Sequence, residues 1–241
     1  MLTTPKHILD AKIANNQLLF PWDEWQAEKA YAPADPALQE RLAKLSDRAN
    51  VAFMLACAEW LIHRFDLVSN DPLPLMYVEA AWAANIHTAY CRYMETDDDD
   101  WHGPARGPMN LALAMIVDSL WDAQDNTPGE YPAWMSNLVL LVLSDSAAFL
   151  DWRDQVMTRL EQYFPAPDDD PDDIFEEEDT RGDYVPREVF DLSLPFDPST
   201  TNALCEQFLG GLDHRQNHCL HHPDEMLNFE DYVDTPYKMP A

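Results

Sequence analysis

An apolar stripe at helical spacing, early in the chain, is the feature that most limits how this sequence can fold. Its members recur at intervals of four, three, four, three and four residues: Leu38, Leu42, Leu45, Ala49, Ala52 and Ala56. Such intervals place apolar side chains on one face of an α-helix. The pattern predicts one long helix from Pro36 to about Phe65, and its three alanines allow a neighbouring helix to approach closely.

Most of the chain up to about residue 164 continues in this helical pattern. Further helices are predicted over residues 5–15, 75–95, 109–121, 136–143 and 146–163. Thr4 and Pro5 resemble an N-cap and a first-turn proline before the first of these. Residues 136–143 also fit a buried strand, but no partner strand is evident nearby, so a helix is favoured. Residues 97–108 predict a loop, because Asp, Gly and Pro dominate them.

Beyond residue 164 the composition changes. Proline and like-charge repulsion oppose a helix in residues 165–179, and residues 184–198 are expected to be extended or irregular. A last helix over residues 199–209 is expected to stop at a glycine pair. The fold class predicted is mainly α, in three parts: a multi-helix bundle (residues 1–165), an acidic linker (166–185) and a short, partly irregular C-terminal segment packing on the bundle (186–241).

Acidic residues are in large excess, and they are concentrated in parts of the chain. The sequence has 44 Asp and Glu against 15 Lys and Arg, but residues 1–50 hold 7 acids and 6 bases, whereas residues 151–200 hold 16 and 4. A field of this sign attracts cationic partners and repels nucleic acid and anionic membranes. The hydrophobic content of 46% excludes a wholly disordered acidic protein.

Four explanations fit the densest run, residues 168–179. A solvated linker is the simplest. A calcium loop is the second, because four acids fall at EF-hand positions one, three, five and twelve: Asp168, Asp170, Asp172 and Asp179. However, Asp173 stands where that loop needs glycine. Adaptation to high salt, the third, would disperse acids over the whole surface. The fourth is contact with a cationic protein.

We predict that two acidic clusters contact a basic partner protein, each beside an apolar anchor. The first cluster is Asp97, Asp98, Asp99 and Asp100, followed by Trp101. The second contains Asp168, Asp169, Asp170, Asp172, Asp173, Glu176, Glu177, Glu178 and Asp179, with the anchors Ile174 and Phe175. Charge guides the approach and anchors hold the complex. Trp101, Trp22 and Trp25 lie in predicted loops or helix edges and are expected to be exposed.

A histidine-rich segment, DHRQNHCLHH, supports an alternative. On a helix, His214, His218 and His222 would share one face, where two imidazoles can bind one zinc ion. Further ligands would have to come from elsewhere, such as Cys205 or Asp213, and the preceding glycine pair opposes a regular helix. Exposed or capping histidines are the simpler interpretation. The alternative function is therefore a metal-binding protein or metal-dependent hydrolase.

Motifs for catalysis are missing from the sequence. It contains no nucleophile elbow, P-loop or dinucleotide fingerprint, so neither an enzyme nor a cofactor is predicted. Two carboxylate–imidazole combinations fall on predicted helices without a motif to fix their geometry: Glu59 with His63, and Glu79 with His87. Cys57 and Cys91 are expected to be core thiols, and all four cysteines are expected to be reduced.

The remaining patterns concern location and function. The first residues lack the features of a secretory signal, and the longest apolar run, residues 138–143, is far shorter than the roughly 18 residues of a membrane span. A cytoplasmic, soluble protein is expected. The preferred function is a non-enzymatic acidic binding protein that neutralises a cationic partner, such as an immunity protein or inhibitor of a nuclease-like toxin. An adaptor or chaperone for a basic protein is its close neighbour.

Overall fold

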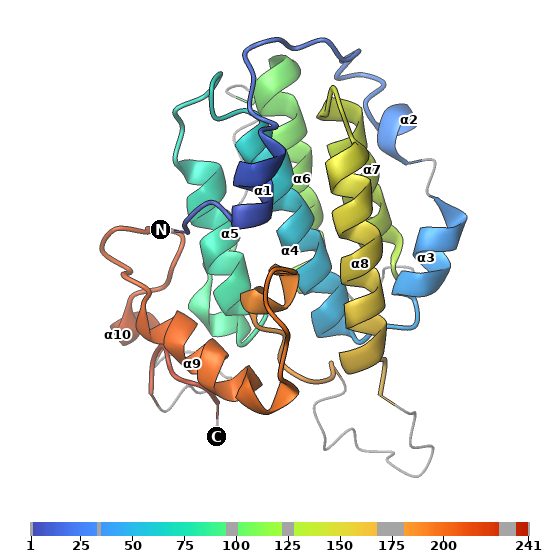
Figure 1. Cartoon of the computed structure of the whole chain (residues 1–241). Helices are drawn as coiled ribbons and strands as arrows, with labels where there is room; N and C mark the ends of the chain where they lie inside the picture. The colour runs from blue at the N-terminus through green and yellow to red at the C-terminus, as the bar shows by residue number, and fades with distance from the viewer. Residues whose placement is uncertain are drawn as a thin grey trace.

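Helix α4 (Asp47–Arg64) lies at the centre of the molecule, with the other long helices around it (Figure 1). The computed structural model describes residues 2–32, 35–94, 101–121, 128–167, 181–226 and 235–240. Three helices pack closely along α4: α5 (Leu73–Ala84), α6 (Gly103–Trp121) and α7 (Glu130–Val142). The chain is mainly α, as predicted. In the described residues, β-structure is limited to two isolated bridges, Leu45 with Pro165 and Cys91 with Leu220.

Helix α4 is enclosed on all sides. Every residue from Arg48 to Arg64 is buried, including the ionisable side chains of Glu59 and His63. An α-helix with no solvent-facing side must find partners for each charge inside the protein, because an unpaired buried charge is costly. Helix α4 therefore decides where polar contacts form in the core.

Helix α8 (Ala147–Tyr163) packs on α4 through aromatic rings. The Trp60 ring lies 5.3 Å from Phe149 and 5.5 Å from Trp152, measured between ring centroids. Three shorter helices complete this side of the molecule: α1 (Lys6–Ala11) against α8, α2 (Glu28–Tyr31) against α7, and α3 (Pro36–Leu42) against both. The predicted helices over residues 136–143 and 146–163 are confirmed, and the first helix ends earlier than predicted.

The prediction of one long helix from Pro36 to Phe65 is wrong, because the helix is interrupted between α3, which ends at Leu42, and α4, which begins at Asp47. The Ser46 side chain accepts a hydrogen bond from the Ala49 amide at 3.2 Å and caps α4. The Ser46 amide in turn donates to the Phe164 carbonyl at 3.1 Å. Contacts with the segment around Phe164 therefore separate the apolar stripe into two helices. The side chains of both parts still belong to one core.

The predicted loop over residues 97–108 is also wrong in its second half. Helix α6 begins at Gly103, which has a φ of 82°, and Pro104 occupies the first turn, where its missing amide hydrogen costs nothing. The helix predicted over residues 75–95 ends at Ala84 and is followed by a 3-10 turn, η1 (Thr88–Tyr90).

The described C-terminal part packs across one end of the helices (Figure 1). It contains two 3-10 turns and two helices: η3 (Arg187–Phe190), η4 (Pro198–Thr200), α9 (Thr201–Gly210) and α10 (Pro223–Met226). The irregular stretch 184–198 and the helix before the glycine pair are as predicted. Trp152 Nε1 donates to the Phe190 carbonyl at 3.1 Å and holds η3 against α8. No helix in the described ranges has the length and apolar character needed to cross a membrane.

Candidate functional site

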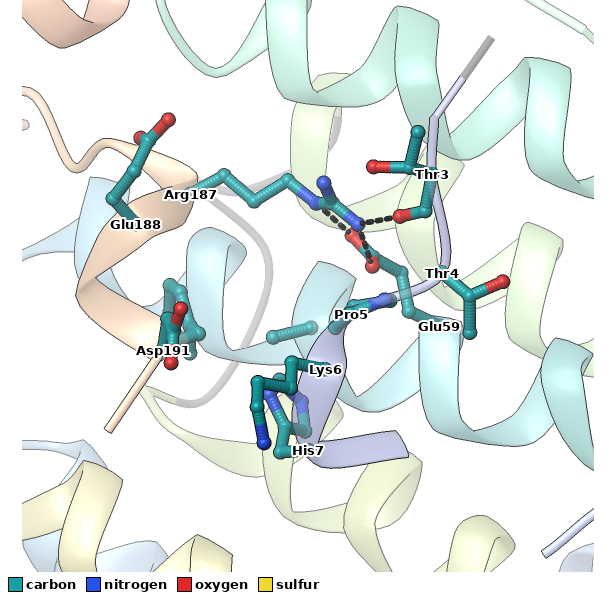
Figure 2. Close-up of a pocket in the computed structure, with 11 residues that line it drawn as sticks. Thr3, Thr4, Pro5, Lys6, His7, Glu59, Arg187, Glu188 and Asp191 are labelled. Carbon is teal, nitrogen blue, oxygen red and sulfur yellow. Dashed lines mark hydrogen bonds and ion pairs between the residues drawn. The ribbon is translucent and has the colours of Figure 1, made fainter. Parts of the chain in front are cut away.

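A pocket forms where the N-terminal segment crosses α4 and η3, and Figure 2 shows its lining. We call it the Glu59 pocket, and its volume is about 210 Å³. Residues 3–7 form one wall, Glu59 projects from α4, and residues 187–191 form the opposite wall. Three segments that are distant in sequence thus meet at one buried carboxylate.

The Glu59 carboxylate lines this pocket and forms an ion pair with Arg187 (Figure 2). Arg187 donates to it from Nε at 2.8 Å and from Nη2 at 2.5 Å, and Trp82 Nε1 donates at 2.9 Å. The Glu59 side chain is 2% exposed, so these three donors replace its water. Glu59 is occupied as an acceptor and is not poised to take a proton from a substrate.

Arg187 is fixed from both sides. Its Nη2 also donates to the Thr3 carbonyl at 2.8 Å, which ties the N-terminal segment to η3 (Figure 2). Burial lowers the pKa of Arg187, but its hydrogen bonds and charge contact with Glu59 outweigh this effect and the net shift is upward. The guanidinium is therefore a permanent cation that joins three segments of the fold.

His7 is a neutral ring in the wall of the Glu59 pocket. It stacks on Trp152 with 5.1 Å between centroids and lies 5.6 Å from Trp60. Burial lowers its pKa to about 4, an effect that nearby Asp191 opposes and Arg187 reinforces. At neutral pH the ring is uncharged and packs as an aromatic side chain.

A second pocket is lined by three of the tryptophans singled out in the sequence. Trp22 and Trp25 precede α2 and Trp101 precedes α6, and they enclose about 400 Å³ together with Glu24 and His102. We call this the tryptophan pocket. The prediction grouped these tryptophans as exposed anchors without any expectation that they would meet.

The three tryptophans differ in exposure. Trp25 is 95% exposed, as predicted, and Trp22 is half-buried. The prediction for Trp101 is wrong: it is 6% exposed, and the Arg106 guanidinium lies over its ring at 5.3 Å. Helix α6 starts earlier than predicted, and the Arg106 side chain on its first turns covers the Trp101 ring.

The Trp22 ring packs directly against Gly107 of α6. A Cβ on Gly107 would lie 2.4 Å from Cζ2 of Trp22, closer than two carbon atoms can approach. Glu24 reaches the same helix, because its carboxylate accepts a hydrogen bond from the Gly103 amide and lies 3.9 Å from His102 Nδ1. Residues 22–24 are thus attached to the first turns of α6.

The predicted acidic contact residues fall mainly outside the described part of the chain. Asp97, Asp98, Asp99 and Asp100 are among them, as is the whole run from 168 to 179, including Ile174 and Phe175. Their assignment to a partner surface stays a prediction. Trp101 is the one member of the two sets that the structure describes.

The histidine segment does not form the helix on which the zinc alternative depended. Residues 211–222 form turns and irregular backbone, and the rings of His214 and His222 pack edge to face with 4.8 Å between centroids. His218 is exposed. Among the described residues, no three His, Cys, Asp or Glu side chains are arranged to hold a metal ion.

The other candidate groups are part of the core. Cys57 is 0% exposed and Cys91 1%, and burial raises the pKa of both thiols, so they are not nucleophiles. All four cysteines are free, as predicted. His63 Nδ1 lies 2.9 Å from Asp66, and Glu79 accepts from Asn217 at 2.9 Å. Glu59, the predicted partner of His63, is instead bound to Arg187 and Trp82.

Comparison with known proteins adds no relative. No protein-family model, curated protein or solved structure matches the chain. The function must therefore be argued from the chain's own geometry.

Sequence reasoning missed the pair of Glu59 and Arg187. The two residues are 128 positions apart, and the range 184–198 was expected to be irregular. One signal was present: Glu59 stands in an otherwise apolar stretch of α4, where a carboxylate requires a cationic partner. The identity of that partner could not be read from the sequence.

Proposed function

We propose that this chain is a non-enzymatic binding protein for a basic protein, such as an immunity protein or inhibitor of a nuclease-like toxin. The observation that carries the proposal is the placement of charge: three of the ten arginines are buried, whereas every described carboxylate except Glu59 and Glu79 is at least partly exposed. An acidic outer surface attracts a cationic partner at long range and opposes the binding of polyphosphates.

Part of the arginine charge lies inside the protein. All ten lie in described parts of the chain: Arg215 is exposed, and the side chains of Arg92 and Arg106, 43% and 40% exposed, pair with Glu225 and Asp71. Arg48, Arg64 and Arg153 are buried, at 3%, 1% and 9% exposed. These three guanidinium groups are withdrawn from the surface, whereas the five lysines lie on it.

Several arginines hold irregular backbone in place. Arg64 donates to the carbonyls of Asn15, Gln17 and Val142 at 2.8, 2.5 and 3.0 Å. Arg159 donates to three more carbonyls, that of Val189 in η3 and those of Asp191 and Leu194 after it. These guanidinium groups stabilise the fold and are not available to a nucleic acid.

The carboxylates show the opposite distribution. Among the described acidic residues, Glu59 and Glu79 alone are buried. In the described part of the chain, the acidic excess of the sequence therefore lies at the surface. A nuclease-like protein exposes a basic groove for phosphates, and a surface of this kind complements such a groove.

Affinity capture tests the proposal. The immobilised full-length chain is exposed to a lysate of its source cells at ~50 mM salt, where screening is weak, and is eluted at ~300 mM. We expect the retained proteins to be basic and to elute with the salt, as identified by mass spectrometry. If no basic protein is retained at low salt, the proposal is wrong.

Two variants of equal net charge locate the contact. In one, Asp168, Asp169 and Asp170 are changed to Asn. In the other, three exposed acids elsewhere are neutralised: Glu28→Gln, Glu40→Gln and Asp151→Asn. Because both lose the same charge, a loss of capture confined to the first variant supports a local contact surface. Equal losses in the two would contradict it.

A further inference from the structure

The tryptophan pocket combines aromatic rings with a single carboxylate. Trp22, Trp25 and Trp101 line it, Glu24 lies among them, and no lysine or arginine belongs to its described lining. Its volume of about 400 Å³ falls within the range typical of small-ligand sites, roughly 300 to 1,000 Å³. Aromatic faces next to one negative charge are the chemistry that recognises an organic cation.

The exposed side chain of Trp25 is the feature that indicates an external partner. Its side chain is 95% exposed, although a large aromatic ring in water is unfavourable. The turn that carries it is well defined: Asp23 accepts from the Trp25 amide at 3.0 Å and from the Gln26 side chain at 3.2 Å. A preorganised, exposed tryptophan is the residue type most enriched at the centres of protein interfaces.

One ring of the lining already contacts a cation that lies outside the lining. Arg106 lies 5.3 Å from the centroid of Trp101, and its charge is balanced by Asp71 at 2.8 Å. This internal contact uses Trp101 and leaves Trp25 for an external group. Glu24 is not neutralised by a lysine or arginine in any described ion pair, and its neighbour at 3.9 Å is His102.

We propose that the tryptophan pocket receives an arginine side chain of the basic partner, with the guanidinium against the Trp25 ring and beside the Glu24 carboxylate. Arginine fits better than lysine, because its planar group stacks on an indole and pairs with a carboxylate through two donors. This inference rests on the proposed function and names the chemical group that the pocket recognises.

Peptide binding to the intact, 15N-labelled chain provides the test. The probe is an acetylated, amidated pentapeptide with one arginine between glycines, and the control replaces arginine by citrulline, which is neutral and nearly identical in shape. Each tryptophan gives its own indole N–H resonance. We expect the Trp25 and Trp22 resonances to move with the arginine peptide and not with the citrulline peptide. Equal shifts with both, or none with either, would overturn the inference.

Matched variants separate the pocket from the general acidity of the surface. We expect Trp25→Ala and Glu24→Gln each to weaken arginine-peptide binding about fivefold or more. Glutamine retains an acceptor for the Gly103 amide, so the loop keeps its attachment. The controls are Leu67→Ala, another exposed apolar side chain at 66%, and Glu28→Gln, an exposed acid outside the pocket. If the controls weaken binding equally, the pocket is not the site.

The two proposals can fail separately. If the lysate capture retains basic proteins but the arginine peptide does not bind, the pocket assignment is wrong and the proposed function stands. If the peptide binds selectively but no basic protein is captured, the pocket recognises a cation and the proposed function is wrong. Capture of the same basic proteins by Trp25→Ala, with unchanged salt dependence, would also count against the pocket.

Discussion

The Glu59 pocket and the tryptophan pocket both place a carboxylate beside tryptophan, yet the two carboxylates are in opposite situations. Glu59 is 2% exposed and accepts from three N–H groups, two of Arg187 and one of Trp82. The Glu24 side chain is 40% exposed and its described contacts are the Gly103 amide and His102. Burial forces a charge to find partners within the protein, whereas exposure leaves it capacity for an external one.

This difference predicts that the two pockets respond differently to mutation. Substitutions around Glu59 should change the free energy of unfolding, because its contacts join the N-terminal segment, α4 and η3. Substitutions around Glu24 should change binding and leave stability nearly intact.

The largest effect is expected from Arg187→Ala. It leaves the buried Glu59 without its cation and with Trp82 as its remaining described donor. We therefore expect a loss of about 2 to 4 kcal/mol in the free energy of unfolding, moderated because Arg187 is 22% exposed and water can enter. Urea unfolding followed by circular dichroism measures it. The control is Arg215→Ala, which removes an exposed arginine and should cost less than about 0.5 kcal/mol.

A double variant tests the reason for that loss. Glu59→Gln combined with Arg187→Gln removes both charges, so its cost should be less than the sum of the two single variants. Additive costs would show that the two side chains are not energetically coupled. The stability of the Glu59 pocket could then not be attributed to this ion pair.

His7 makes the Glu59 pocket sensitive to acid. Its folded-state pKa is about 4, below the ordinary 6.5, so between these values the unfolded chain binds a proton that the folded chain does not. The stability present above pH 6.5 is therefore lost as the pH falls towards 4, by at most about 3 kcal/mol.

His7→Phe provides the comparison, because phenylalanine can stack on Trp152 and does not titrate. Urea unfolding at pH 7, 5.5 and 4 should show the wild type losing stability relative to this variant as the pH falls. Other titrating groups are common to both chains and cancel in the difference. A difference that stays constant over this range would mean that His7 is not the cause.

The helical character of the chain could be predicted because it depends on local periodicity. The break between α3 and α4 could not, because Ala43 and Lys44 are good helix formers and the stripe continues through Leu45. The break results from distant contacts: Ala166 donates to the Lys44 carbonyl at 2.9 Å, and Leu45 forms a bridge with Pro165. Such partners are not visible within a sequence window.

The candidate sites were predictable in part for the same reason. Trp22 and Trp25 could be recognised as surface residues from their loop context. Their approach to Trp101 could not, because it depends on the glycine at position 107 of α6 and on the link between Glu24 and Gly103. Residue types indicated the chemistry, and tertiary contacts determined which residues share a pocket.

Gly107→Ala tests whether the packing of Trp22 on Gly107 positions this ring in the tryptophan pocket. Alanine favours a helix by about 1 kcal/mol over glycine, but the new Cβ would lie 2.4 Å from the Trp22 ring and must displace it. We expect a net destabilisation of about 1 kcal/mol, a shifted Trp22 indole resonance and weaker arginine-peptide binding. Gly210→Ala is the control, since a Cβ there meets nothing within 4 Å and should be neutral or stabilising.

Trp25→Ala should have the smallest effect on stability and separates the two pockets most clearly. With 95% of its side chain exposed, Trp25 has little packing to lose, so the free energy of unfolding should change by less than about 0.5 kcal/mol. Its counterpart is Trp82→Phe, which removes a donor to buried Glu59 and should cost about 1 to 3 kcal/mol. If Trp25→Ala were as destabilising as Trp82→Phe, Trp25 would be part of the folded core in solution, and its exposure could not be attributed to a partner.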